Sequence, residues 1–183
     1  MKIVAFFASL RFNSGFDAIA LTHLREPMPT IITQEQPDSP DAMQLIAELD
    51  GVLSPLYAAE SRHGFSLEKL LRDGVAFFVV RVDGEAAACG GILIVGNEYG
   101  EVKRMYVRPQ FRGLGLARKL LDHLANYSRQ QGVLVLRLET GIHQKEAVGL
   151  YESYGFQRIP PFGPYWDDPV SLCYEKRLDV DVS

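Results

Sequence analysis

The chain has few of the residues on which metal centres and covalent catalysis depend. Its 183 residues include two cysteines, four histidines and one tryptophan. Cys89 and Cys173 are far apart, so the chain has neither a CxxC pair nor a spacing typical of metal ligands. Cys89 lies in an apolar, strand-like run, where a buried and inert thiol is expected. We therefore expect no metal centre and no cysteine nucleophile.

Long apolar runs and clusters of one charge are also lacking. No stretch approaches the roughly 20 apolar residues of a membrane-spanning helix. The net charge is −4, and no run of Lys and Arg is long enough to follow a nucleic-acid backbone. The length and the 47% hydrophobic content are ordinary for one globular domain. We expect a cytoplasmic protein that binds neither membranes nor nucleic acids.

The first 27 residues stand apart from the rest. They contain a short apolar run, but Arg11 and Asp17 interrupt the pattern of a secretory signal, so secretion is not expected. We assign residues 1–27 to an N-terminal extension of unknown role and residues 28–183 to a single domain. The sequence leaves the oligomeric state open, with a homodimer as one option.

The middle of the chain carries a pattern typical of anion binding. Residues 101–119, EVKRMYVRPQFRGLGLARK, read as a strand, a glycine loop and the start of an amphipathic helix. The start of a helix offers unpaired N–H groups and a partial positive charge. Gly113 and Gly115 leave these groups open to a phosphate, and Arg108 and Arg112 could add charge-assisted hydrogen bonds. The pattern predicts a site for a phosphorylated cofactor.

The spacing of this loop excludes two common nucleotide motifs and favours a third. The P-loop is absent, and G-x-G-x-x-G fails because Arg118 replaces its third glycine. The pattern Gln110-x-x-Gly113-x-Gly115, after a strand ending in Met-Tyr-Val, resembles the acetyl-CoA loop of the GNAT N-acetyltransferase superfamily. Residues 147–156, AVGLYESYGF, resemble its second signature, A-x-x-L-Y-x-x-x-G-F.

The resemblance covers roughly residues 31–178 and includes features of a bacterial subgroup of small-molecule acetyltransferases. It implies an α/β GNAT fold, in which a mixed central sheet with splayed strands is flanked by helices. It also implies acetyl-CoA as co-substrate, lying between the strands that end at Val107 and Glu139. Gln144 stands where the family usually has Asn. The residues implied in cofactor binding are Met105, Tyr106, Val107, Gln110, Arg112, Gly113, Leu114, Gly115, Leu116, Ala117 and Gln144.

The same resemblance suggests the catalytic groups. Tyr151 matches the family's general acid, which donates a proton to the leaving thiolate; packing in the core is the alternative. Glu101 is a candidate general base, with a solvated carboxylate at a strand end as the alternative. Period-two alternation predicts Glu101, Lys103 and Met105 on one face of the strand. His143 is a further candidate base, although an exposed loop histidine is expected more often.

Contacts to the acceptor are expected at two places. Glu139 and Thr140 end the strand after the first signature, where they could touch the acceptor or supply a second candidate base. The loop over residues 160–169 is stiffened by prolines and rich in aromatic and acidic side chains. In this loop Tyr165 could form an aromatic wall and Asp167 could attract a cationic amine. A loop that only caps the core is the alternative.

These observations predict direct transfer of an acetyl group from acetyl-CoA to a primary amine of a small molecule. Acetylation of a protein lysine or N-terminus is one alternative, and a non-catalytic acyl-CoA-binding module is another. The element order β-α-α-β-β-β-α-β-α-β-β is expected from hydrophobic periodicity and turn signals. Strands are expected near residues 31–33, 75–82, 85–95, 101–107, 133–139, 156–159 and 171–175, and helices near 41–57, 67–72, 114–131 and 145–154.

Overall fold

The computed structural model describes residues 29–57, 66–165 and 168–179. The N-terminal extension of residues 1–27 lies outside this part of the chain. The expected order of elements is confirmed, with an added 3-10 turn, η2, before the third helix. The elements are β1 (Thr30–Glu35), α1 (Pro40–Leu53), α2 (Leu67–Arg72), β2 (Ala76–Val82), β3 (Glu85–Val95), β4 (Tyr99–Val107), η2 (Pro109–Phe111), α3 (Leu116–Gln130), β5 (Val135–Gly141), α4 (Lys145–Ser153), β6 (Gln157–Ile159) and β7 (Ser171–Arg177).

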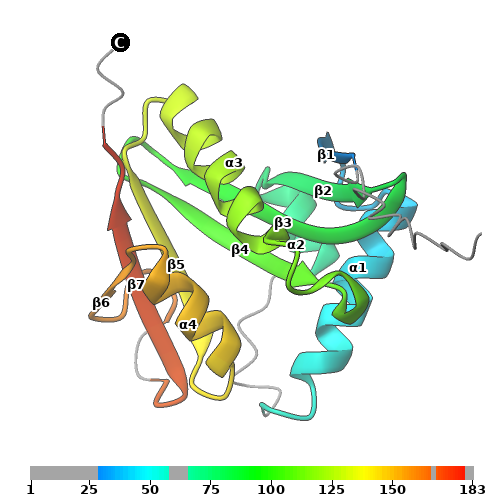
Figure 1. Ribbon diagram of the computed structural model, residues 1–183. Helices are drawn as coiled ribbons and strands as arrows, with labels where there is room; N and C mark the ends of the chain where they lie inside the picture. Colours follow the sequence, from blue (N-terminus) through cyan, green and yellow to red (C-terminus); the bar gives the residue numbers. More distant parts are fainter. Residues whose placement is uncertain (1–28, 58–65, 166–167, 180–183) are drawn as a thin grey trace, which may run out of the picture.

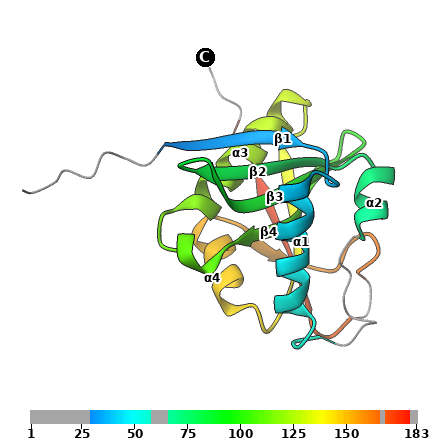
Figure 2. The ribbon, with the colours of Figure 1, turned by 90° about the vertical axis from the view of Figure 1, so that its right-hand side faces the viewer.

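The strands form one sheet of order β1-β2-β3-β4-β5-β7-β6, in which only the β4–β5 pair is parallel. Helices α1 and α2 cover one face of the sheet, and α3 and α4 cover the other (Figures 1 and 2). Asp83 and Gly84 join β2 to β3 with φ values of 52° and 83°. Two positive φ values in succession are typical of the tight hairpin turn that Asp-Gly predicts.

Strand β2 illustrates why the sheet has a core on each side. Phe77 and Val79 pack with α1 and α2, whereas Phe78 and Val80 pack with α3 and α4. All four side chains are buried, as expected for a strand covered on both faces. Cys89 is fully buried on the α1 face, and burial raises the pKa of its thiol to about 12. The expectation of a buried thiol is confirmed.

The parallel pairing of β4 with β5 is short. Only Gly100 with Leu136 and Glu101 with Arg137 are paired, although β4 continues to Val107 and β5 to Gly141. Beyond these pairs the two strands diverge (Figure 1). The edge of β4 that faces β5 therefore has no strand partner from residue 102 onward within the described chain.

A bulge in β4 changes which side chains share a face. Arg104 has a φ of 54°, and two residues of β4 oppose Gly90 between the Gly91–Lys103 and Cys89–Tyr106 pairs. Lys103 remains on the α1 face, but Met105 packs on the α3 face, where it would touch a side chain placed at Gly90. The expected alternation of Glu101, Lys103 and Met105 is wrong at Met105, because the extra residue reverses the alternation.

A hydrogen-bonded carboxylate connects β1, β2 and the start of α1. Glu35 accepts hydrogen bonds from Arg81 at 2.5 Å, Ser39 at 2.7 Å and Thr33 at 2.9 Å. Ser39 is also the N-cap of α1, and Arg81 contacts Asp41 in its first turn. Burial acts to raise the pKa of Glu35, but the hydrogen bonds from Arg81, Ser39 and Thr33 outweigh it and lower the pKa.

Because its pKa is lower in the folded state, Glu35 stabilises the fold above its unfolded pKa, and this contribution is lost as the pH falls. We expect Glu35→Gln to lower the free energy of unfolding at pH 7 by roughly 1 to 2 kcal/mol. The variant should also lose less stability than the wild type between about pH 5 and pH 3. Urea unfolding measured across this range tests both points.

Glu98→Gln is the matched control, because Glu98 lies exposed in the turn between β3 and β4. If the Glu35 and Glu98 variants showed the same stability and the same acid dependence, the network around Glu35 would contribute nothing.

Candidate active site

The glycine loop has the geometry of an open cradle at the start of α3. Gly113 and Gly115 have φ values of 80° and 73°, which favour glycine. No atom lies within 4 Å of a Cβ built at either position, so the space beside the backbone is open. Gly115 is the N-cap of α3, and no side chain caps the helix there. The first N–H groups of α3 are thus available to an anion.

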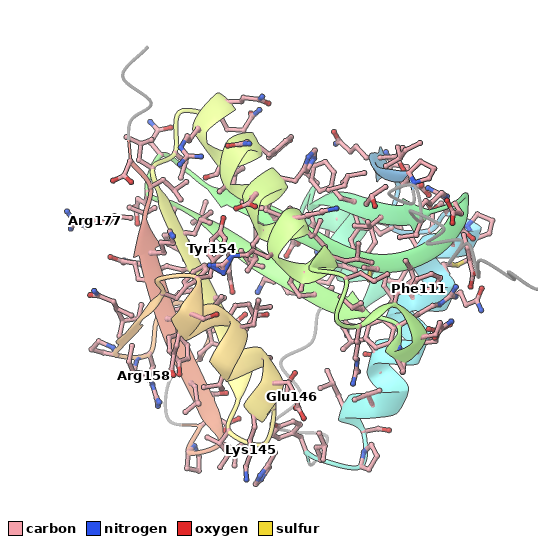
Figure 3. All side chains as sticks on the ribbon, viewed as in Figure 1. Phe111, Lys145, Glu146, Tyr154, Arg158 and Arg177 are labelled. Atoms are coloured by element: carbon pink, nitrogen blue, oxygen red, sulfur yellow. The ribbon has the colours of Figure 1, made fainter. Side chains whose placement is uncertain are left out.

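The other residues expected in the loop take different positions around this cradle. Gln110, Arg112 and Leu114 are exposed, and the Arg112 Nε donates to the Val107 carbonyl at 3.3 Å. The side chain of Leu116 is buried in the core, so only its backbone could reach a ligand. Phe111, in η2, lies beside this loop (Figure 3). Gln144 is the N-cap residue of α4, the helix that carries Tyr151.

Arg108 is not part of the anion site, which corrects the expectation from sequence. Its side chain is buried and donates to Glu48 of α1 through Nε at 3.0 Å and Nη2 at 2.8 Å. Its Nη1 donates to the Ala86 carbonyl at 2.6 Å. The hydrogen bonds to Glu48 raise the pKa of the guanidinium. Arg108 therefore joins α1 to the end of β4 and leaves Arg112 as the exposed cation of the loop motif.

The end of β4 presents its backbone next to the gap between β4 and β5. Met105 faces α3, and Tyr106 is buried against α1. Val107 ends the strand, and its carbonyl accepts from Arg112. Since the side chains of Met105 and Tyr106 pack in opposite cores, their possible contacts to a ligand in the gap come mainly from the main chain.

Tyr151 projects from α4 into the core on the α3 side of the sheet. It packs with Leu136 and Leu138 of β5, and its ring lies 5.8 Å from the ring of Phe156. Burial raises the pKa of its phenol, and the charge of Glu139 adds to this effect. Tyr151 therefore stays protonated at neutral pH and can donate a hydrogen bond.

Tyr154, one turn along α4, has a structural role. It extends from the end of α4 toward α3 (Figure 3), and its hydroxyl donates to Asp122 at 2.7 Å. This hydrogen bond joins the end of α4 to α3.

Glu101 lies in a buried polar network with Lys103 and Tyr165. The three residues are 4%, 7% and 2% exposed. The Lys103 ammonium lies 2.5 Å from Glu101 Oε1, the Tyr165 hydroxyl donates to the same oxygen at 2.6 Å, and Lys103 also contacts Tyr165. Burial lowers the pKa of Lys103, and the Glu101 carboxylate opposes this shift.

This network changes the interpretation of two expected site residues. Within this network Glu101 Oε1 accepts two hydrogen bonds, one from Lys103 and one from Tyr165. The burial of Glu101 excludes the solvated strand end proposed as the alternative, and its role as general base stays a prediction. Tyr165, expected as an aromatic wall for the acceptor, is instead buried and attaches its loop to β4. Asp167 lies outside the described residues.

Glu139 is the carboxylate at the diverging end of β5. It is half-buried and accepts a hydrogen bond from Ser171 at 2.6 Å. Alternation along β5 places it on the α1 face with Arg137, opposite the face where Leu138 packs against Tyr151. Thr140 is buried and shares the face of Leu138, so it does not point to the same side as Glu139. The two residues expected to act together are separated by the sheet.

Sequence reasoning missed Tyr57, which closes one end of this region. Tyr57 follows α1 and is buried against Gly141, the last residue of β5. Its hydroxyl accepts a hydrogen bond from the backbone N–H of His143 at 2.9 Å, and its ring lies 5.5 Å from the His143 ring. His143 itself is exposed. The glycine that ends Leu-Glu-Thr-Gly was the available signal, because glycine in a strand often marks a close approach.

Comparison with known proteins places the chain in a family. Residues 28–156 match the model of the acetyltransferase (GNAT) family, and the chain belongs to this family. A relative named IAA acetyltransferase, from Azospirillum brasilense, is 43% identical over 153 residues, which are 82% of this chain and all of the relative. The N-acetyltransferase YsnE of Bacillus subtilis, uncharacterised in its activity, is 35% identical over 65% of this chain and 80% of its own length.

Solved structures confirm the GNAT fold. A Klebsiella pneumoniae structure assigned to the acyl-CoA N-acyltransferases has a TM-score of 0.72 and 38% identity, and the match covers 82% of this chain and 98% of that one. The PaiA N-acetyltransferase of Thermoplasma acidophilum, solved with coenzyme A, has a TM-score of 0.65 and 20% identity, covering 82% and 99%. The chain is an acetyl-CoA-dependent N-acetyltransferase. Within its described part, no helix is long and apolar enough to cross a membrane.

The buried network yields a prediction about stability. Lys103→Met leaves the Glu101 carboxylate buried without its cation, so we expect the free energy of unfolding to fall by about 3 kcal/mol or more. Adding Glu101→Gln removes the isolated charge and should recover a large part of the loss. Urea unfolding of both single variants and of the double variant measures the coupling. If the two single losses simply added, Lys103 and Glu101 would not act as a pair.

Proposed function

We propose that this protein transfers an acetyl group directly from acetyl-CoA to a primary amine of a small molecule. The observation that carries the proposal is the divergence of β4 and β5, with Tyr151 on one face of the sheet and Glu139 on the other. The gap gives an amine on the α1 face access to a thioester on the α3 face. The network of Glu101, Lys103 and Tyr165 borders the gap on the β4 side.

The residues present fit the co-substrate at two points. The open cradle at Gly113 and Gly115 suits a pyrophosphate, because unpaired N–H groups and the helix dipole meet there. The unpaired edge of β4 suits the amide-bearing pantetheine arm, to which Met105 and Val107 would offer backbone groups as in an added strand. When bound, acetyl-CoA supplies an activated acyl group on a thiol leaving group.

Tyr151 and Glu139 divide the proton transfers. Glu139, directly or through a water molecule, takes a proton from the neutral amine nitrogen as that nitrogen bonds to the acetyl carbon. Tyr151 gives its proton, or a hydrogen bond, to the sulfur as the carbon–sulfur bond breaks. The position of Glu139 on the α1 face and the influence of its charge on Tyr151 support this assignment.

Several observations favour a small acceptor over a protein. Tyr57 packs on Gly141 at the end of β5, and the Tyr165 hydroxyl attaches its loop to Glu101 of β4. On the α1 face these two tyrosines therefore border the gap between β4 and β5 from two sides. A peptide substrate needs an extended open groove there. The relative named IAA acetyltransferase, similar over 82% of this chain, also supports a small acceptor. The non-catalytic alternative is disfavoured because the family and both proton-transfer groups point to an enzyme.

Gly115→Glu tests the cofactor site. A carboxylate and a side chain placed in the cradle should repel and obstruct the phosphates, so we expect acetyl-CoA affinity to fall at least about tenfold with the fold retained. Titration calorimetry measures the dissociation constant, and circular dichroism checks the fold. Gly132→Glu is the control, because Gly132 has a similar φ of 77° and open space beyond the other end of α3. Equal affinities for the two variants would refute the assignment.

Tyr151→Phe and Glu139→Gln test the chemistry. Each keeps the shape of the side chain but removes its proton-transfer group, so turnover should fall by roughly 100-fold while acetyl-CoA binding changes little. Glu139→Gln should also abolish the acidic limb of the pH profile of kcat/KM. Steady-state kinetics by thiol release measure these effects once an amine has been found by screening. A turnover within about threefold of wild type in either variant would exclude that residue from catalysis.

A further inference from the structure

Gly141 has no side chain, and the Tyr57 ring occupies the space that its side chain would take on the face of β5 that carries Glu139. A Cβ built on Gly141 would lie 2.1 Å from the Tyr57 hydroxyl oxygen, 2.2 Å from Cζ and 2.6 Å from Cε1. Gly141 does not have a positive φ, so its backbone conformation does not require a glycine at this position. The close approach of the phenol does explain it, because any larger residue would displace Tyr57.

The position of this contact relates it to the site. Residues two apart in a strand share a face and lie about 6 to 7 Å apart. The Tyr57 ring therefore lies on the α1 face, one such step beyond Glu139 along β5. A second interaction, from the His143 N–H to the Tyr57 hydroxyl, fixes the ring at the start of the loop leading to α4.

Tyr57 also joins parts of the chain that are separated by the gap. Helix α1, which precedes it, is attached to β4 through Glu48–Arg108 and Asp50–Arg104 ion pairs. The Tyr57–Gly141 contact then spans from this helix to the end of β5. A buried aromatic ring held at both its edge and its hydroxyl is a rigid wall, unlike a flexible loop side chain.

We propose that Tyr57, seated on Gly141, is the specificity-determining wall of the acceptor site and limits the bulk of the amine that can reach Glu139. This inference rests on the proposed acetyl transfer to a small amine. It assigns compact primary amines as the preferred acceptor class, and it makes Gly141 a positioning residue that acts through Tyr57.

The test uses the full chain, acetyl-CoA and three primary amines of increasing bulk: ethylamine, butylamine and 2-phenylethylamine. For Tyr57→Ala and Gly141→Ala, we expect kcat/KM for 2-phenylethylamine relative to ethylamine to rise roughly tenfold or more, since the pocket wall is removed or displaced. The dissociation constant of acetyl-CoA, measured by calorimetry, should remain within about threefold of wild type. A crystal structure of Gly141→Ala should show the Tyr57 ring moved away from β5.

Gly51→Ala is the matched control, because it adds the same methyl group to α1 at a position with no atom within 4 Å of the new Cβ. It should keep the wild-type ratio between the amines. An unchanged ratio in folded Tyr57→Ala would overturn the inference, whether or not Gly141→Ala folds. If wild type acetylated none of the three amines and no other small amine in a wider screen, the proposed function itself would fail. If the wild type acetylated the amines but Tyr57→Ala left the ratio of kcat/KM between them unchanged, only the role of Tyr57 as a wall would be refuted.

Discussion

The parallel ladder between β4 and β5 ends after Glu101 and Arg137, and every part of the site is arranged around that end. A sheet interior normally pairs all its backbone groups, because unpaired N–H and C=O groups are costly when buried. Here β4 continues for six residues without β5. The exposed edge can pair with an extended amide-bearing ligand, and the separation of the strands connects the two faces of the sheet.

The bulge at Arg104 and the contacts of α1 keep this edge in place. Arg104 adopts a positive φ that is unfavourable for a residue with a side chain, and its guanidinium is paired with Asp50 at 2.5 Å. Arg108 donates to Glu48, which lies two residues before Asp50 on the same helix. The bulge turns Met105 toward α3 and Tyr106 toward α1, so each anchors the strand in a different core.

Unlike Met105 and Tyr106, which pack in apolar cores, Glu101, Lys103 and Tyr165 form a buried polar network. It places charge where a covered sheet usually has apolar side chains. Removing an ion pair from water is unfavourable unless its hydrogen bonds are well satisfied. In this protein the tyrosine comes from a segment 62 residues beyond Lys103, so the network fixes the approach of that loop to β4. Glu139, at the other side of the gap, is half-buried and accepts a hydrogen bond from Ser171.

The sequence alone determined the order of the elements, the glycine cradle and the GNAT family, because these depend on local periodicity and short motifs. Gln110-x-x-Gly113-x-Gly115 and the Tyr151 signature could be identified without tertiary information. The partners of Arg108, the burial of Glu101 and Tyr165, and the reversal at Met105 could not. Each depends on residues distant in sequence or on a single extra residue in β4. The contact between Tyr57 and Gly141 spans 84 positions, and only the packing of α1 across the diverging strands brings these two residues together.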